Sequence, residues 1–136
     1  MPPPAHRYGS LAEVYGSGSY APFTNALRLA GTAPATLVRF AQPAGEFPDP
    51  PTDDVTLAIN ESGSGVMEFD LGAGCRQMPF RVGDLVLKPP GVATRFANSR
   101  PHAKSFVSLP TSFLAKTAGA PPDFGRLHAD AFRCPV

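Results

Sequence analysis

The sequence predicts an all-β domain, a barrel or sandwich built from short strands. Short runs of apolar and β-branched residues recur about every eight to twelve residues, the spacing typical of such folds. The runs are separated by turn-forming residues, and the chain of 136 residues holds 17 prolines and 13 glycines. No apolar run approaches the ~20 residues that a membrane-spanning helix needs. The length suits one domain with its own core, and the sequence shows no internal repeat.

The first 24 residues are expected to form an N-terminal arm. Three consecutive prolines favour extended geometry at its start, and a Gly-Ser-Gly-Ser stretch further on is typical of a linker. Residues 11–15 fit either one helical turn or a short strand. All three tyrosines of the chain lie in this arm: Tyr8, Tyr15 and Tyr20. Two interpretations stay open, a frayed terminus and an arm whose aromatic side chains dock on the domain.

The strands follow in order, and each is predicted from alternation or from a short β-prone run. They are expected at residues 26–29, 35–42, 54–60, 66–71, 75–81, 85–87, 92–96 and 103–109. Residues 43–53 contain four prolines and are therefore expected to form a loop. Residues 61–65, Glu-Ser-Gly-Ser-Gly, predict the loop of a hairpin.

The C-terminal part predicts one short helix and an irregular tail. Pro110 is followed by Thr and Ser, which can cap a helix, and the residues after them continue to 118 with helical spacing. Residues 119–136 are expected to be irregular, with aromatic and aliphatic side chains as anchors. Those anchors are Phe124, Leu127 and Phe132.

A strand, sharp turn and second strand between residues 83 and 98 carry the first resemblance. Gly83, Pro89, Gly91 and Asn98 stand at the spacing of the second signature of the cupin family. The resemblance implies a small β-barrel of jelly-roll topology. In cupin enzymes the signature also holds a metal-binding His, and in this chain that position is Thr94.

The other positions at which a cupin enzyme places metal ligands are also changed. Two registers are possible for the first signature, and neither supplies a His or a Glu. They place Pro50, Thr52 and Thr56, or Thr52, Asp54 and Ala58, at the ligand positions. The three histidines, His6, His102 and His128, are not at ligand spacing, and a surface or capping role is expected for them. We therefore expect neither metal nor cofactor.

Catalytic patterns are equally scarce, and we expect no enzyme. The sequence has no Gly-x-Ser-x-Gly elbow, and Cys75 and Cys134 have no neighbouring His in sequence. The pair Asp53-Asp54 is expected to be a solvated turn rather than an acid/base site. A net charge of +1 gives no reason to expect nucleic-acid or membrane binding by this segment. The N-terminus has no apolar signal region, so a cytoplasmic location with reduced cysteines is expected.

A wider resemblance covers roughly residues 35–133. The runs Asp53-Asp-Val-Thr-Leu-Ala-Ile, Arg81-Val-Gly-Asp-Leu-Val-Leu-Lys-Pro-Pro-Gly and Phe106-Val-Ser-Leu-Pro-Thr-Ser-Phe-Leu-Ala are similar to the N-terminal sensor domain of AraC-type transcription regulators. The resemblance implies a cupin-like ligand-sensing domain over residues 25–136. It also implies a helix-turn-helix domain that binds DNA and is absent from this chain. A stand-alone metal-free cupin that binds a sugar or similar metabolite is the alternative.

If the domain is a sensor, a small-molecule effector enters the barrel and the arm closes over it. Thr94 and Phe96 share a face that should point inward, and Thr56 occupies a ligand position in one register. Arg39 fits either a surface position or a contact to an anion or a sugar. Tyr8 and Tyr15 are the arm residues expected to contact the ligand. We therefore list as ligand-binding candidates Arg39, Thr56, Thr94, Phe96, Tyr8 and Tyr15.

An inward Thr56 has a consequence for its neighbours. Because side chains alternate along a strand, Val55, Leu57 and Ile59 would then point outward together. Such a patch could support a weak homodimer, or the helix at 112–118 could cover it with Phe113 and Leu114. We favour covering by the helix, with any dimer weak.

Overall fold

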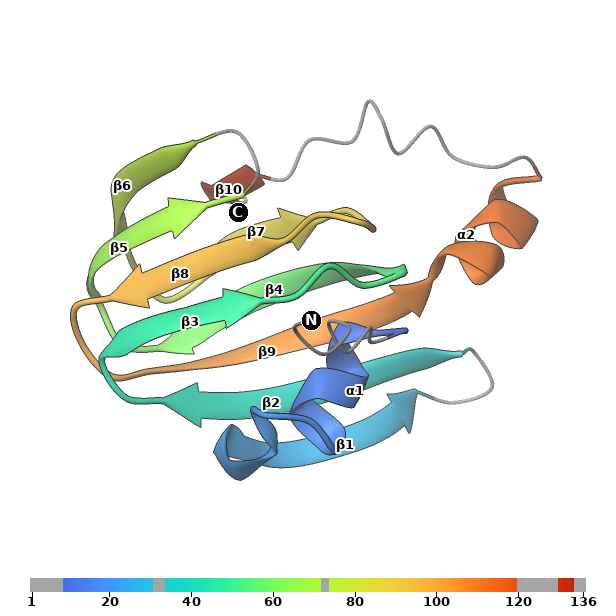
Figure 1. The fold of residues 1–136 in the computed structure, drawn as a ribbon, viewed down its shortest axis with the longest axis horizontal. Helices are drawn as coiled ribbons and strands as arrows, with labels where there is room; N and C mark the ends of the chain where they lie inside the picture. Colours follow the sequence, from blue (N-terminus) through green and yellow to red (C-terminus); the bar gives the residue numbers. More distant parts are fainter. Residues whose placement is uncertain (1–8, 31–33, 72–73, 120–129, 134–136) are drawn as a thin grey trace, which may run out of the picture.

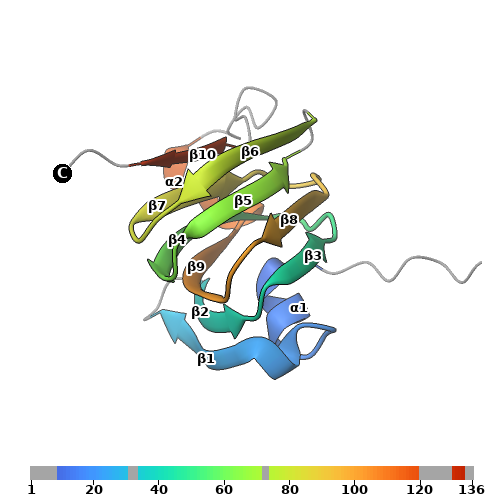
Figure 2. The same cartoon turned by 90° about the vertical axis from the view of Figure 1, so that its left-hand side faces the viewer.

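The computed structural model describes residues 9–30, 34–71, 74–119 and 130–133. Its strands form two antiparallel sheets that face each other (Figures 1 and 2). The larger sheet has the order β1 (Thr24–Ala30), β2 (Ala35–Gln42), β9 (His102–Pro110), β4 (Asp54–Ser62), β7 (Asp84–Lys88), β10 (Asp130–Arg133). The smaller has the order β3 (Gly45–Asp49), β8 (Thr94–Asn98), β5 (Gly65–Asp70), β6 (Cys75–Phe80). The expected all-β fold is confirmed.

The loop expected at residues 43–53 is wrong, because β3 forms inside it. Pro48 lies within β3, which pairs with β8 on one side and is an edge strand of the smaller sheet. An edge position tolerates proline, because its missing N–H costs no ladder hydrogen bond on the open side. The proline count alone could not distinguish a loop from an edge strand.

The hairpin expected at residues 61–65 is also wrong. β4 pairs with β7 and β9 in the larger sheet, whereas β5 pairs with β6 and β8 in the smaller one. The turn therefore passes from one sheet to the other. Gly63 has φ 96°, and a Cβ at this position would lie 2.6 Å from the Pro101 carbonyl oxygen. Glycine is required here by the close approach of another loop as well as by the turn.

The turns around the 83–98 unit match their prediction. Gly83 has φ 92°, and the carboxylate of Asp84 accepts a hydrogen bond from the Arg81 N–H at 2.8 Å. Gly91 has φ 77°, and its N–H donates to the Thr52 carbonyl at 2.8 Å. These turns direct β7 into the larger sheet and β8 into the smaller one.

Helix α2 (Thr111–Ala118) follows β9 as predicted, but its start differs from the expectation. Pro110 is the N-cap residue, and no side chain caps the helix. Within the tail expected to be irregular, residues 130–133 form β10 and pair with β7. The expected anchors Phe124 and Leu127 lie outside the described residues.

Helix α1 (Leu11–Gly16) settles the choice between helix and strand for residues 11–15. The Ser10 hydroxyl accepts from the Glu13 N–H at 3.1 Å, and the Glu13 carboxylate accepts from the Gly9 N–H at 3.1 Å. This reciprocal pattern is close to a capping box. The helix lies against β1 and β2 (Figure 1). Part of the expected arm is therefore packed on the barrel.

The core beneath α1 combines helix and sheet side chains. It consists of Leu11, Ala12, Val14, Tyr15, Val38, Phe40 and Phe106. A second cluster lies further along the barrel and consists of Met67, Phe69, Leu71, Phe80 and Val86. Full burial of one such side chain contributes about 1.5–3 kcal/mol, so α1 is a substantial part of the stability of the fold.

The expectation that the helix at 112–118 covers the outer face of the larger sheet is wrong. Leu57 is 41% exposed and Ile59 is 40% exposed, whereas Val55 is buried. No residue of α2 is buried, and the helix continues beyond the end of β9 instead of returning over β4 (Figure 1). Leu57 and Ile59 are thus left uncovered within the described residues. None of the helices in this part of the chain is long and apolar enough to cross a membrane.

Candidate functional site

A cavity lies between the two sheets and beneath α1. Its volume is ≈ 40 Å³, room for about three water molecules. Strands of both sheets contribute alternate residues to it, as expected for inward-facing side chains. The lining residues are Leu11, Tyr15, Phe40, Gln42, Phe47, Asp49, Thr56, Ala58, Val86, Lys88, Phe96, Asn98, His102, Lys104 and Phe106.

Aromatic rings form much of the cavity wall. The Tyr15 ring of α1 lies 4.5 Å from the Phe40 ring and 5.2 Å from the Phe106 ring, measured between centroids. Tilted and edge-to-face contacts of this kind are favourable and fix the helix over the cavity. The wall is therefore apolar, which strengthens any electrostatic interaction inside.

Three charged side chains are buried at the cavity: Asp49, Lys88 and Lys104. The Lys88 ammonium donates to the Pro50 carbonyl at 2.8 Å. Burial raises the pKa of Asp49 to about 6, although Lys88 and Lys104 oppose this rise. Burial lowers the pKa of Lys104 to about 8, opposed by Asp49 and Asp84. The cavity is lined by two lysines and a single carboxylate.

Several buried polar atoms at the cavity have no hydrogen-bond partner among the described residues. Both carboxamide atoms of Asn98 are in this state, and the residue is 5% exposed. Oδ1 of Asp49 is a third such atom. Buried polar groups are normally hydrogen-bonded, to protein, water or a ligand. These atoms can be satisfied by water or by a polar guest.

A chain of polar contacts runs along one side of the cavity. The Gln42 amide lies 3.4 Å from the Tyr15 hydroxyl, and its Oε1 lies 3.2 Å from Nε2 of His102. His102 begins β9 and is buried, so of the surface and capping roles expected for it the surface position is wrong. Burial, with Lys104 adding to it, lowers the pKa of His102 to about 4, and its imidazole is neutral near pH 7.

The sequence-predicted site residues divide into three groups. Tyr15, Thr56 and Phe96 line the cavity. Thr94 is buried in register opposite Asp49 and lines an open depression at one end of the barrel, which Asp49 also borders. Asp49 therefore lies between the cavity and the outside.

The other two candidates do not reach the cavity in the described structure. Arg39 lies on the outer face, where its side chain is 59% exposed and pairs with Glu61 at 3.1 Å. Its neighbours Val38 and Phe40 point inward, so alternation places Arg39 outward, and of the two roles left open for it the surface position is observed. Tyr8 lies outside the described residues.

Sequence reasoning missed most of the polar lining, namely Gln42, Asp49, Lys88, Asn98, His102 and Lys104. A signal existed for Lys104, which lies two residues from the apolar Phe106 in the same strand and so shares its face. Asn98 was noticed as part of a signature but not as a lining residue. Asp49 could not be found, because its strand was read as a loop.

The polar lining does not fit a metal ion. No group of three or more His, Cys, Asp or Glu side chains converges in the described residues. Of these types, the cavity is lined by His102 and Asp49, with two lysines beside them. A protonated ammonium has no lone pair to offer a metal. The usual metal chemistry of the cupin fold therefore has no donor set at this cavity.

Asp54 is not the solvated turn that was expected. It is buried, and its carboxylate accepts hydrogen bonds from the Leu11 N–H at 3.1 Å and from the Ser108 hydroxyl. Two donors on one carboxylate indicate a structural role. Asp54 ties the first turn of α1 to strands β4 and β9.

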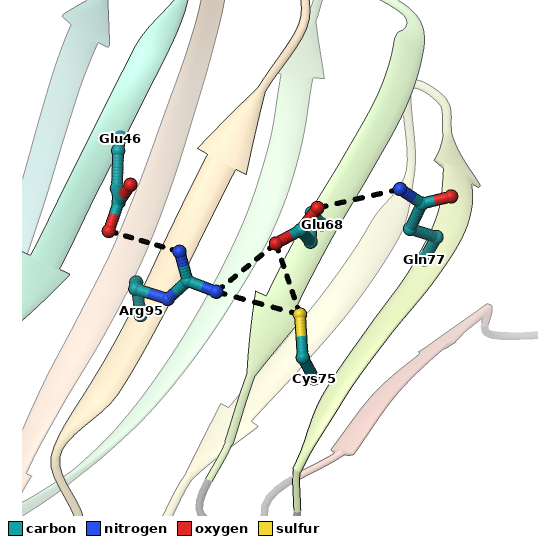
Figure 3. A network of polar contacts seen from close by, with 5 residues as sticks. All are labelled: Glu46, Glu68, Cys75, Gln77 and Arg95. Carbon is teal, nitrogen blue, oxygen red and sulfur yellow. Dashed lines mark hydrogen bonds and ion pairs between the residues drawn. The ribbon is translucent and has the colours of Figure 1, made fainter.

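A network of polar contacts covers the outer face of the smaller sheet (Figure 3). Arg95 of β8 pairs with Glu46 of β3 at 3.0 Å and with Glu68 of β5 at 3.1 Å. The Cys75 thiol lies 3.1 Å from Glu68, and this carboxylate raises the pKa of Cys75. A raised pKa disfavours the thiolate, so Cys75 is not set up as a nucleophile.

Comparison with known proteins gives the fold. No family model and no curated protein matches the chain. The cupin domain of Cnp3 from Schizosaccharomyces pombe matches at a TM-score of 0.53 and 16% identity, over 72% of each chain. The chain therefore has the fold of a cupin domain.

Two further structures match less well. Ethanolamine utilization protein Q from Salmonella typhimurium gives a TM-score of 0.46 at 14% identity, over 56% of this chain and 58% of that one. The cupin-2 domain of an XRE family transcriptional regulator from Enterobacter cloacae gives 0.45 at 14% identity, over 55% of this chain and 80% of that one. The chain thus spans little more than half the length of the Salmonella protein.

Proposed function

We propose that this domain binds a small-molecule effector inside the barrel, without a metal ion, and that it serves as the ligand-sensing part of a transcription regulator. The observation that carries the proposal is the cavity beneath α1, in which buried polar atoms of Asn98 and Asp49 have no partner in the described structure. Polar atoms in a cavity of this kind are satisfied by water or by a polar guest, and we assign them to the guest.

The position of α1 supports a sensing role. Leu11 and Tyr15 line the cavity, so a guest touches the helix directly. A guest of a few atoms fits without movement, whereas a larger one must displace α1. Either event changes the packing of the N-terminal segment, which is the kind of change that a sensor passes on.

The finer assignment, a sensor of the AraC type, rests on the sequence resemblance described above. The alternative is a stand-alone metal-free cupin that binds a sugar or similar metabolite. The coding sequence beyond Val136 discriminates between the two. A helix-turn-helix domain encoded there favours the regulator, and a stop codon at that point favours the stand-alone binder.

We further propose that the domain is not an enzyme and does not itself bind DNA. Within the described residues, no cluster of metal-binding side chains converges at the cavity, and the Cys75 thiol, which lies outside it, has a raised pKa. The net charge of +1 offers little attraction to a phosphate backbone. A gel shift at ~150 mM salt that showed sequence-selective binding would contradict the second statement.

A thermal-shift screen tests the proposed function. The library should contain sugars, amino acids, hydroxy acids, neutral alcohols and aromatic compounds. A true ligand at 100 times its Kd is expected to stabilise the domain by ~2.7 kcal/mol. If no compound raises the melting temperature and none binds by calorimetry, the proposed function is wrong.

A further inference from the structure

We propose that the cavity recognises a small hydroxycarboxylate, with Lys104 and the Asn98 amide binding its carboxylate and with Asn98 Oδ1 and Asp49 sharing the hydrogen of its hydroxyl. The inference rests on the proposed function, since it names the ligand class of the same cavity.

Lys104 is the main reason to expect an anion. The residue is 8% exposed, and its ammonium has no oxygen acceptor within hydrogen-bond distance among the described residues. Its nearest contacts are the Met67 sulfur at 4.0 Å and the Phe96 ring, whose centroid lies 5.2 Å away. A buried ammonium with such weak partners is costly unless an anion joins it.

The carboxylates nearby already have other donors. Asp54 accepts from the Leu11 N–H and the Ser108 hydroxyl, and Asp84 accepts from the Arg81 N–H. Asp49 is the one carboxylate that lines the cavity with the two lysines. The negative charges of Asp54 and Asp84 act on Lys88 and Lys104, respectively, from behind the cavity wall. Lys104, which has no oxygen partner among the described residues, is therefore the group that an anionic guest would contact.

Asn98 adds geometric specificity to this charge. Its amide can donate to a carboxylate oxygen, while its carbonyl oxygen requires a donor from the guest. Oδ1 of Asp49 has no donor within normal hydrogen-bond distance, although the neighbouring Thr94 hydroxyl also acts on this carboxylate. A hydroxyl next to a carboxylate supplies acceptors for the Asn98 amide and one hydrogen, which Asn98 Oδ1 and Asp49 Oδ1 share. A simple carboxylate would leave the acceptors unpaired.

Size limits the ligand further. The cavity has a volume of ≈ 40 Å³, room for about three water molecules, so lactate is near the upper limit and enters with a small outward movement of α1. The aromatic wall accommodates its methyl group. A longer hydroxycarboxylate requires α1 to move further outward.

Calorimetry with four probes tests the inference: lactate, propionate, propane-1,2-diol and glycine. We expect lactate to bind best, propionate about tenfold more weakly, and propane-1,2-diol and glycine not measurably. Lys104→Met, which removes the charge and keeps an unbranched side chain one atom shorter, should weaken lactate binding at least about tenfold. Lys116→Met on exposed α2 is the matched control and should leave the affinity unchanged.

An NMR measurement on the wild-type domain needs no variant. Lactate should shift the side-chain amide resonances of Asn98 specifically. Equal binding of lactate and propane-1,2-diol, tighter binding of glycine, unchanged affinity in Lys104→Met, or an unmoved Asn98 amide would each overturn the ligand class. If neutral compounds bind in the cavity and carboxylates do not, the proposed function stands and this inference fails. If nothing binds, both are wrong.

Discussion

The Asp54 carboxylate accepts a hydrogen bond from the backbone N–H of Leu11 at 3.1 Å, across 43 residues of chain. A barrel strand thereby holds the first turn of the helix that closes the cavity. The Ser108 hydroxyl donates to the same carboxylate oxygen and links β9 to the contact. The closure of the cavity therefore depends on one buried carboxylate.

Asp54→Ala should loosen α1 before the rest of the fold. The variant leaves the Leu11 N–H and the Ser108 hydroxyl without their acceptor, which should lower the free energy of unfolding by about 3 kcal/mol. Asp54→Asn retains an acceptor oxygen and should cost less. Hydrogen exchange of the α1 amides, compared with that of β9 amides, measures the effect. Equal acceleration in both elements would show that Asp54 supports the whole fold rather than α1.

Two buried groups, Asp49 and His102, should change the free energy of unfolding with pH in opposite directions. The pKa of Asp49 rises from its ordinary 3.8 to about 6, so the folded domain holds a proton that the unfolded chain loses. Its contribution to stability is present below pH 3.8 and is lost as the pH rises to about 6. The pKa of His102 falls from 6.5 to about 4, so its contribution is present above pH 6.5 and is lost as the pH falls to about 4.

Because the two windows overlap, stability in the wild type should change little between about pH 4 and 6. In His102→Gln, stability should fall as the pH rises through this range, by up to about 3 kcal/mol. In Asp49→Asn, it should rise instead. Urea unfolding at several pH values measures both slopes. Slopes of the same sign in the two variants would contradict the assignment of these pKa values.

We expect the domain to tolerate a charged side chain on the exposed outer face of the larger sheet. Since Leu57 is 41% exposed, Leu57→Asp should cost about 1 kcal/mol and leave the domain folded. Val38→Asp changes a fully buried position on the inner face of the same sheet and should prevent folding. Circular dichroism with urea unfolding compares the two variants. Loss of folding in Leu57→Asp would mean that another segment covers this face.

Self-association through this face remains a prediction, with a second copy of the chain as the partner. Any wild-type dimer should be weak and should disappear in Leu57→Asp. Light scattering over a concentration series measures it. A tight dimer that persists in the variant would place the interface elsewhere.

Metal content provides an independent test. The purified domain should carry no stoichiometric Fe, Mn, Ni or Zn, because Thr94 stands at the position of the usual His and the cavity is lined by two lysines. Elemental analysis before and after gentle chelation measures it. About one tightly held metal ion per chain would contradict the proposed metal-free barrel.

The sequence predicted most of the strands because alternation and turn residues are local signals. Gly83 and Gly91 adopt the positive φ values that their turns require, and Val38 and Phe40 are buried as the pattern of β2 indicates. Which strands pair with one another, and in which of the two sheets, depends on the whole chain and not on local residues. For this reason the turn at Gly63 was read as a hairpin, although it joins two sheets.

The site was less accessible to sequence reasoning than the fold. Thr56 and Phe96 were found because they follow a family pattern. Lys104 and His102 were missed because charged or titratable residues are usually exposed, and for Lys104 this expectation outweighed the alternation that places it on the face of Phe106. Burial of Lys104 becomes evident only when β9 is placed within the larger sheet, facing Phe96 of the smaller sheet.

Ala58 offers the most direct test of ligand binding beneath α1. Ala58 is a residue of β4 whose side chain lines the cavity. Ala58→Leu should therefore fill the cavity at a moderate cost in stability. NMR titration of wild type and variant with the best compound of the screen is the decisive measurement. We predict shifts at Tyr15, Phe96 and Phe106 in the wild type and no binding by the variant. Unchanged binding by a folded Ala58→Leu domain would place the ligand outside the barrel and contradict the account.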